Sequence, residues 1–179
     1  MIACVDTHYF EGGTRTALLQ FRDWDDAAPE HTTIYEHHGD AAEYVPGKFY
    51  LRELPCIAEV IERSGCEFDT IVVDGYVHLD EGRDGLGKKL FAVLQERTAV
   101  IGVAKNSYRS AIGARHLLRR GSKRPLFITA IGVPVETATT LIDGMHGEFR
   151  IPTLLKQVDA LARKSAKNKS SLSLRKRLT

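Results

Sequence analysis

The sequence predicts an α/β domain in which helices flank a mixed β-sheet. Three apolar, β-branched segments come first and are separated by turn signals, which is typical of an antiparallel meander. Short, continuously apolar runs then alternate with helical patterns, as expected for parallel strands that are buried on both faces of a sheet. An apolar residue every three or four positions marks the helices that would cover those faces.

The meander is expected at the N-terminal end of the chain. Residues 2–10 are apolar and β-branched, and Glu11-Gly12-Gly13 is a turn signal that leads into a second strand, residues 14–21. The charged stretch 22–30 is expected to be a loop before a third strand, residues 32–36.

Helices and strands alternate in the rest of the chain. The expected helices cover residues 50–64, 86–96, 135–145 and 153–164, and the expected strands cover residues 70–77, 100–104 and 125–131. Residues 110–120 fit a helix or irregular structure. A three-stranded meander followed by βαβ units is the arrangement of the ribonuclease-H-like fold, although the pattern alone leaves other mixed α/β sheets open.

Size and composition indicate one globular domain with a basic tail. The chain has 179 residues, of which 43% are hydrophobic and 27% charged. We expect residues 1–164 to form the domain and residues 165–179 to be a tail that is disordered or becomes helical only on binding. No apolar run approaches the ~20 residues of a membrane span, and the N-terminus does not resemble a secretory signal. Three cysteines without a CxxC pair favour a reducing compartment, so we expect a cytoplasmic protein.

Basic residues are segregated along the chain, although the net charge is only +2. From Arg163 onward there are seven Lys or Arg and no acidic residue, so the first 162 residues carry 18 basic against 23 acidic side chains. Residues 97–135 hold eight basic residues and no Asp or Glu. Such segregation is typical of a protein with a polyanionic partner, most simply nucleic acid, and equally of a solvated basic surface.

Two carboxylates interrupt apolar strands. Asp6 lies within the first strand, and Asp74 ends the run IVVD just before Gly75. Neighbouring strands could place both carboxylates side by side, and Glu53, near the start of the first long helix, could lean over the same edge of the sheet. Three converging carboxylates repel one another unless a hard divalent ion lies between them, which indicates a Mg²⁺ or Mn²⁺ site for phosphodiester hydrolysis. Each Asp could instead be hydrogen-bonded at a strand end.

Three other features carry weaker chemical signals. Lys105 ends the strand VIGVAK and could contact a phosphate or a carboxylate, or lie on the surface. Residues 82–89 match the GxxxxGK pattern of a nucleotide-binding loop. However, Lys89 stands where Ser or Thr would bind Mg²⁺, so a Gly-rich entry to a helix fits better than nucleotide hydrolysis. The seven histidines show no zinc-binding spacing.

Several short motifs, taken in order, resemble those of the endonuclease V family. They begin with Asp6 in the first strand and end with Asp159. Between these residues lie Tyr44-Val45-Pro46-Gly47, Leu51-Arg52-Glu53, Val72-Val73-Asp74-Gly75, Gly102-Val103-Ala104-Lys105 and Phe149-Arg150-Ile151-Pro152. Each motif is short, and the specific signal is the ordered set, which extends over residues 2–160.

The resemblance implies a ribonuclease-H-like fold and a metal-dependent nuclease that cuts DNA or RNA on the 3′ side of a deaminated adenine, inosine. The implied metal ligands for Mg²⁺ or Mn²⁺ are Asp6, Glu53 and Asp74. Lys105 is implied to assist at the phosphate. Tyr44-Val45-Pro46-Gly47 would be a wedge that fills the space left by the extracted base, and Gly47 and Gly75 would let the backbone approach that base closely.

The sequence departs from the family in two segments. Asp80 and Glu81 stand where a His-Pro pair is usual. Gly132-Val133-Pro134 replaces a Gly-His-Arg motif, whose His is implied to lie near the metal. The residues that could take the place of this His are His78, Asp143 and His146. Because of these departures, the alternative function is a nucleic-acid-binding protein that has lost or changed its chemistry.

Overall fold

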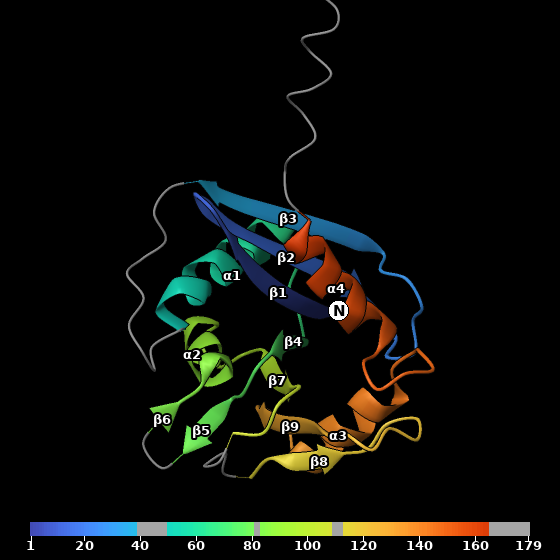
Figure 1. Cartoon of the computed structure of the whole chain (residues 1–179). Coiled ribbons are helices and arrows are strands. Elements are labelled where there is room, and N and C mark those ends of the chain that lie inside the picture. The colour runs from blue at the N-terminus through green and yellow to red at the C-terminus, as the bar shows by residue number, and fades with distance from the viewer. Residues whose placement is uncertain (39–49, 81–82, 109–112, 165–179) are drawn as a thin grey trace, which may run out of the picture.

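A seven-stranded mixed sheet organises the computed structural model, which describes residues 1–38, 50–80, 83–108 and 113–164 (Figure 1). The strands are β1 (Ile2–Phe10), β2 (Gly13–Phe21), β3 (His31–His38), β4 (Thr70–Asp74), β5 (His78–Asp80), β6 (Arg83–Asp84), β7 (Ala99–Ala104), β8 (Arg115–Leu117) and β9 (Leu126–Ile131). The helices are α1 (Tyr50–Ser64), α2 (Leu86–Val93), α3 (Val135–Gly144) and α4 (Thr153–Arg163).

The order of strands in the sheet is β3-β2-β1-β4-β7-β9-β8, while β5 and β6 form a separate hairpin. The pairs β1–β2 and β2–β3 are antiparallel, and the pairs β1–β4 and β4–β7 are parallel. The predicted meander with parallel strands beside it is therefore confirmed. Because β1, β4 and β7 run in one direction, residues near their carboxyl ends lie at the same end of the sheet.

Alternate residues of the central strands face two different hydrophobic layers. Ala3 and Val5 of β1 pack in the layer covered by α1 and α2, whereas Cys4 packs in the layer covered by α3 and α4. Figure 1 shows the two pairs of helices on opposite sides of the sheet. Burial on both faces explains why β4 and β7 are continuously apolar rather than alternating.

Most predicted boundaries agree with the structure to within two residues, but three predicted segments differ from it more strongly. The strand expected over residues 70–77 ends at Asp74, because Gly75 has a φ of 139°, a backbone conformation that L side chains rarely adopt. The helix expected over residues 86–96 ends at Val93, and the positive φ values of Gln95 (55°) and Glu96 (61°) turn the chain away. In the predicted helical or irregular segment 110–120, the described residues 115–117 form the edge strand β8, which pairs with β9.

A fully buried arginine fixes the segment that leads into α4. The Arg119 guanidinium donates hydrogen bonds to the main-chain oxygens of Asp143 (3.2 Å), Phe149 (2.7 Å), Gly147 (3.4 Å) and Met145. A buried charge is costly unless it is hydrogen-bonded, and here four carbonyl groups surround it. Arg119 therefore holds the loop between α3 and α4 in place.

Two predicted segments lie outside the described residues. They are Tyr44-Val45-Pro46-Gly47, the expected wedge, and residues 165–179, the expected basic tail. Both stay predictions. Among the described helices, none has the length and apolar character needed to cross a bilayer.

Candidate active site

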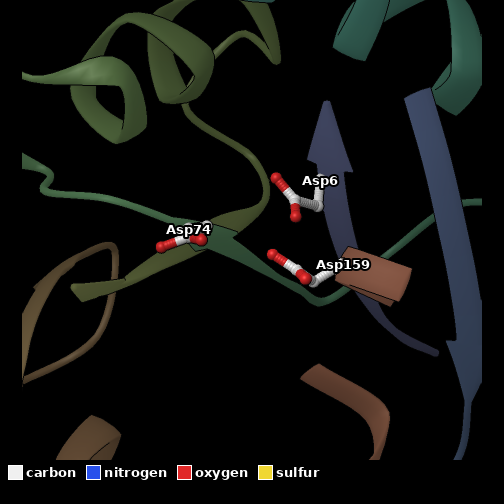
Figure 2. Close-up of side chains that lie close together, drawn as sticks. All are labelled: Asp6, Asp74 and Asp159. Atoms are coloured by element: carbon white, nitrogen blue, oxygen red, sulfur yellow. The ribbon is translucent and has the colours of Figure 1, made fainter. Parts of the chain in front are cut away.

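Three aspartates meet where the parallel strands end. Asp6 comes from β1, Asp74 is the last residue of β4, and Asp159 comes from α4, which packs across β1. Each offers one carboxylate oxygen, and these oxygens lie within 4.8 Å of one another. Figure 2 shows the three side chains gathered at this place from two strands and one helix. The predicted convergence of Asp6 and Asp74 is therefore found, and Asp159 completes the group.

Ionisation of Asp6 is unfavourable in this cluster. Burial and the negative charges of Asp74 and Asp159 raise the pKa of Asp6 to about 7. Asp159 behaves differently. Partial burial opposes its ionisation, but the hydrogen bond from Arg163 and the nearby Lys105 charge hold its pKa below the usual range. A bound cation would therefore favour the ionised form of Asp6.

Two cations border the aspartates. The Lys105 ammonium, which directly follows β7, lies 2.6 Å from Asp74 Oδ2 and 3.3 Å from Asp159 Oδ1. Arg163, one turn along α4 from Asp159, places its Nε 2.9 Å from Asp159 Oδ2 and its Nη2 3.1 Å from Oδ1. Arg150 donates hydrogen bonds to the main-chain oxygens of Lys105 and of Pro125 (2.7 Å). The end of β7 is therefore tied to the segment that precedes α4.

Glu53 lies beside the cluster rather than in it. It belongs to the first turn of α1 and lines the same cavity as the three aspartates. Burial raises its pKa to about 8, with smaller contributions from the charges of Asp6 and Asp74. Its carboxylate oxygens are not among those that lie within 4.8 Å of one another.

A cavity of about 520 Å³ opens next to the carboxylates. Its other walls come from the segments that follow β4 and β7, from the β5–β6 hairpin and from the first residues of α1 and α2. Gly75 lines it, as does His8. The remaining lining residues away from the carboxylates include Tyr50, Tyr76, Leu79, Arg83, Leu86 and Tyr108. The cavity therefore joins an acidic wall to an aromatic one.

The donor set suits a hard divalent cation. All of the converging ligand atoms are carboxylate oxygens, and Mg²⁺ and Mn²⁺ prefer such ligands. Burial raises the pKa values of Asp6 and Glu53, the neighbouring negative charges add to the effect, and a bound cation would favour both ionised forms. A chelating group with these properties differs from acidic residues scattered over a surface.

Asp159 was not among the predicted metal ligands, which were Asp6, Glu53 and Asp74. It lies in an amphipathic helix, 85 residues after Asp74, and looks like any solvent-facing acid of that helix. Only its place in the ordered motifs marked it. None of the proposed substitutes for the missing His, which are His78, Asp143 and His146, lines the cavity within the described residues.

The replaced Gly-His-Arg motif lies far from the carboxylates, contrary to expectation. Ile131, which precedes Gly132, pairs with Val100 near the start of β7, whereas Lys105 follows the end of β7. Five residues of strand span about 16 Å. Because the motif is at the opposite end of the sheet, the absence of its His does not remove a side chain from this site.

The GxxxxGK segment has a structural explanation. Its described residues begin with β6 of the small β5–β6 hairpin and continue into α2, so no strand of the main sheet leads into them. A Cβ at Gly85 would lie 2.2 Å from the main-chain oxygen of Tyr76, so close packing requires glycine there. Lys88 and Lys89 both pair with Asp84, at 2.9 Å and 3.1 Å. These contacts favour the Gly-rich helix entry over a phosphate-binding loop.

Solved structures with the same fold come from the endonuclease V family. Endonuclease V of Streptomyces avermitilis is 22% identical, with a TM-score of 0.73 over 90% of this chain and 79% of that one. Endonuclease V of Ciona intestinalis, in complex with a 23mer DNA containing an inosine followed by a ribo-adenosine, is 15% identical, with a TM-score of 0.76 over 90% and 83%. The catalytic domain of human endonuclease V is 20% identical, with a TM-score of 0.72 over 90% and 80%.

These likenesses establish the shared ribonuclease-H-like fold that the sequence predicted. Among curated proteins, none matches the chain significantly. The endonuclease V family model, in contrast, matches residues 1–142, which include two of the three clustered aspartates as well as Glu53 and Lys105. The chain belongs to the endonuclease V family.

Proposed function

We propose that this protein is a metal-dependent endonuclease that hydrolyses a phosphodiester bond on the 3′ side of inosine in DNA or RNA. The observation that carries the proposal is the convergence of Asp6, Asp74 and Asp159 on a cavity of about 520 Å³. Family membership supports nuclease chemistry. The structure of the Ciona intestinalis relative with inosine-containing DNA supports the substrate.

The proposed roles follow from position. Asp6, Asp74 and Asp159 would hold Mg²⁺ or Mn²⁺, and Glu53 would lie beside the ion. When bound, such an ion would lower the pKa of a water molecule and offset charge on the phosphate oxygens.

Lys105 would act at the phosphate. Its ammonium lies between Asp74 and Asp159, so it is placed to offset the negative charge that develops on a phosphate entering the cluster. Hydrolysis consumes one water: its oxygen forms a bond to phosphorus, the bond from phosphorus to the strand's leaving oxygen breaks, and that oxygen gains a proton.

Gly75 would admit the base. It lines the cavity directly after Asp74, and its φ of 139° favours glycine, so the main chain there can come close to a ligand without an obstructing Cβ. The proposed wedge, Tyr44-Val45-Pro46-Gly47, would fill the space that the extracted base leaves in the strand.

The alternative is a binding protein without nuclease activity. One observation favours it: the departure at Asp80 falls next to the cavity, where Asp80 is bonded to Arg83, a lining residue. The other departure, at Gly132-Val133-Pro134, gives it no support because it lies at the far end of the sheet.

The test uses end-labelled DNA and RNA strands, each with and without one inosine, in Mg²⁺, in Mn²⁺ and in chelator. We expect one cut at a fixed position 3′ to the inosine, only in the presence of a divalent ion. Binding of the inosine strand without cutting in either ion would favour the binding protein. Equal cutting of strands with and without inosine would contradict the proposed specificity.

A further inference from the structure

The cavity beside the aspartates has an acidic wall and an aromatic wall, which match the phosphate and the base of a nucleotide. Carboxylates, which suit the metal-assisted chemistry of a phosphate, form one wall. The segments that follow β4 and β7 contribute the aromatic residues Tyr76 and Tyr108 to another. A strand with a phosphate at the carboxylates could therefore place one of its bases against the aromatic wall.

Tyr108 is presented to this cavity by a fixed main chain. The Tyr76 hydroxyl donates a hydrogen bond to the main-chain oxygen of Asn106 (2.7 Å) and accepts one from the main-chain N–H of Tyr108 (3.1 Å). Tyr76 itself is only 8% exposed, and its ring lies 6.5 Å from that of Phe127. The buried tyrosine therefore anchors the segment that carries the exposed one.

The Tyr108 ring remains accessible. Tyr108 is 37% exposed although its ring is large and apolar, and it lines the cavity. Its ring centre lies 6.2 Å from that of Tyr76, with an angle of 53° between the planes, so the two rings are not stacked face to face. An accessible aromatic face in a nucleic-acid cavity is a surface on which a base can stack.

A planar cation lies over one face of the Tyr108 ring. The Arg83 guanidinium lies 6.0 Å from the centre of the Tyr108 ring and also lines the cavity. Its Nε is held by both carboxylate oxygens of Asp80, at 2.9 Å and 2.8 Å. Aromatic rings and guanidinium planes are the two kinds of side chain on which bases stack in proteins that bind single strands.

We propose that Tyr108, anchored by Tyr76 and bordered by Arg83, is the stacking surface for the base that enters this cavity. The inference rests on the proposed function, since it assumes that a strand is bound with its phosphate at the aspartates. Stacking depends little on which base is present, because every base has a flat face. Tyr108 therefore contributes affinity for a base over an empty sugar, and other contacts select inosine.

The experiment compares two labelled strands that differ only at one position, which holds either inosine or an abasic site. Binding is measured by fluorescence anisotropy in chelator, so that no cutting occurs. The variants are Tyr108→Phe, which keeps the ring, and Tyr108→Leu, which keeps an apolar side chain without a flat face. Phe149→Ala is the matched control, because Phe149 is an exposed aromatic residue, at 70% exposure, that does not line the cavity.

We expect Tyr108→Leu to weaken binding of the inosine strand by roughly fivefold to a hundredfold, while its binding of the abasic strand stays within about twofold of wild type. Tyr108→Phe and Phe149→Ala should bind both strands as the wild type does. Unchanged binding of the inosine strand by Tyr108→Leu would overturn the inference, as would an equal loss for both strands.

A second variant guards against a folding defect in Tyr108→Leu. Tyr108→Trp keeps a ring that can stack. The fluorescence of the introduced indole should be quenched by the inosine strand and not by the abasic strand. Quenching by neither strand would overturn the inference. A wild type that cuts inosine strands while Tyr108→Leu binds them normally would refute the stacking surface alone. The proposed function, and this inference with it, would be refuted if the wild type did not cut inosine strands and bound them no more tightly than abasic strands.

Discussion

Charged side chains at two sites in this protein are compensated in opposite ways. The Arg119 guanidinium is fully buried and is surrounded by four main-chain carbonyl groups, so hydrogen bonds satisfy it without any ligand. Asp6, Asp74 and Asp159 converge on one another, and their repulsion helps to raise the pKa of Asp6 to about 7. The first site is complete and supports the fold. The second gains from added positive charge, which is the property of a cation site.

The largest expected effect is on cutting. Asp6→Asn or Asp74→Asn removes a charge from the cluster, so we expect cleavage of an inosine strand to fall roughly a thousandfold, because stabilisation of charge at the reacting phosphate is lost. Asp6→Asn should keep at least the wild-type melting temperature because repulsion is relieved, whereas Asp74→Asn also loses the charge that pairs with Lys105 at 2.6 Å. Rates come from single-turnover cleavage and stability from thermal unfolding.

Glu59→Gln is the matched control for this loss. Glu59 is an acid of α1 that pairs with Arg63 at 2.6 Å and does not line the main cavity. It should cut as the wild type does. Cleavage within tenfold of wild type by either aspartate variant would contradict a role at the reacting atoms.

At Arg119, in contrast, a substitution should lower the stability of the fold. Arg119→Met leaves buried carbonyl groups without donors, so we expect the free energy of unfolding to fall by about 2–4 kcal/mol. Arg115→Met removes an exposed arginine that pairs with exposed Glu136, and its effect should stay within about 0.5 kcal/mol. Urea unfolding measures both. A loss below about 1 kcal/mol for Arg119→Met would mean that the loop between α3 and α4 has another anchor.

The pH dependence of stability distinguishes the two sites further. The folded pKa of Asp6, about 7, lies above its ordinary value of 3.8. Between these values the folded state binds more protons than the unfolded state, so the contribution of Asp6 to stability falls as the pH rises. In chelator at pH 8, Asp6→Asn should therefore be more stable than wild type by about 1–3 kcal/mol, and this advantage should vanish near pH 4.

Divalent ions supply the control for that prediction. If Mg²⁺ or Mn²⁺ binds the aspartates of the folded wild type, as proposed, it should raise the wild-type melting temperature at pH 8 more than that of Asp6→Asn. Two results would show that the raised pKa of Asp6 does not cost the fold stability. One is an equal rise in melting temperature for the two proteins, and the other is a pH dependence of stability that Asp6→Asn leaves unchanged.

The smallest effect is expected at Arg163. Its side chain is 60% exposed, and Asp159 keeps its contact with Lys105 when Arg163 is removed. Arg163→Gln should change the free energy of unfolding by less than about 0.5 kcal/mol and cleavage by no more than about tenfold. A hundredfold loss of cleavage with unchanged stability would instead place Arg163 at the reacting phosphate.

Much of the fold was readable from residue patterns. The meander, the parallel pair β4 and β7, and all four long helices follow from the apolar periodicity and from turn residues such as Gly12 and Gly13. The short strand β8 could not be predicted from such patterns. Its three residues, with Arg115 and His116 exposed, form a strand only through pairing with β9. Tertiary pairing, rather than local preference, determines such an edge.

The site was readable only where strands position it. Asp6 and Asp74 interrupt apolar strands, and a carboxylate in such a place needs an explanation. Asp159 gives no such signal, because an acid in an amphipathic helix is ordinary and its neighbours come from strands far away in sequence. The expected location of the missing Gly-His-Arg motif near the metal was wrong because sequence order does not show that β9 runs antiparallel to β7, which puts the motif at the other end of the sheet.

The most direct test of the central claim is cutting of an inosine strand by Asp159→Asn and wild type side by side, in Mg²⁺ and in chelator. If the three aspartates form the metal site, wild type cuts in Mg²⁺ only. Asp159→Asn then cuts at least roughly a hundredfold more slowly and remains folded. The claim that the three aspartates form the metal site would be contradicted by cleavage at the wild-type rate by Asp159→Asn, or by cleavage by wild type in chelator.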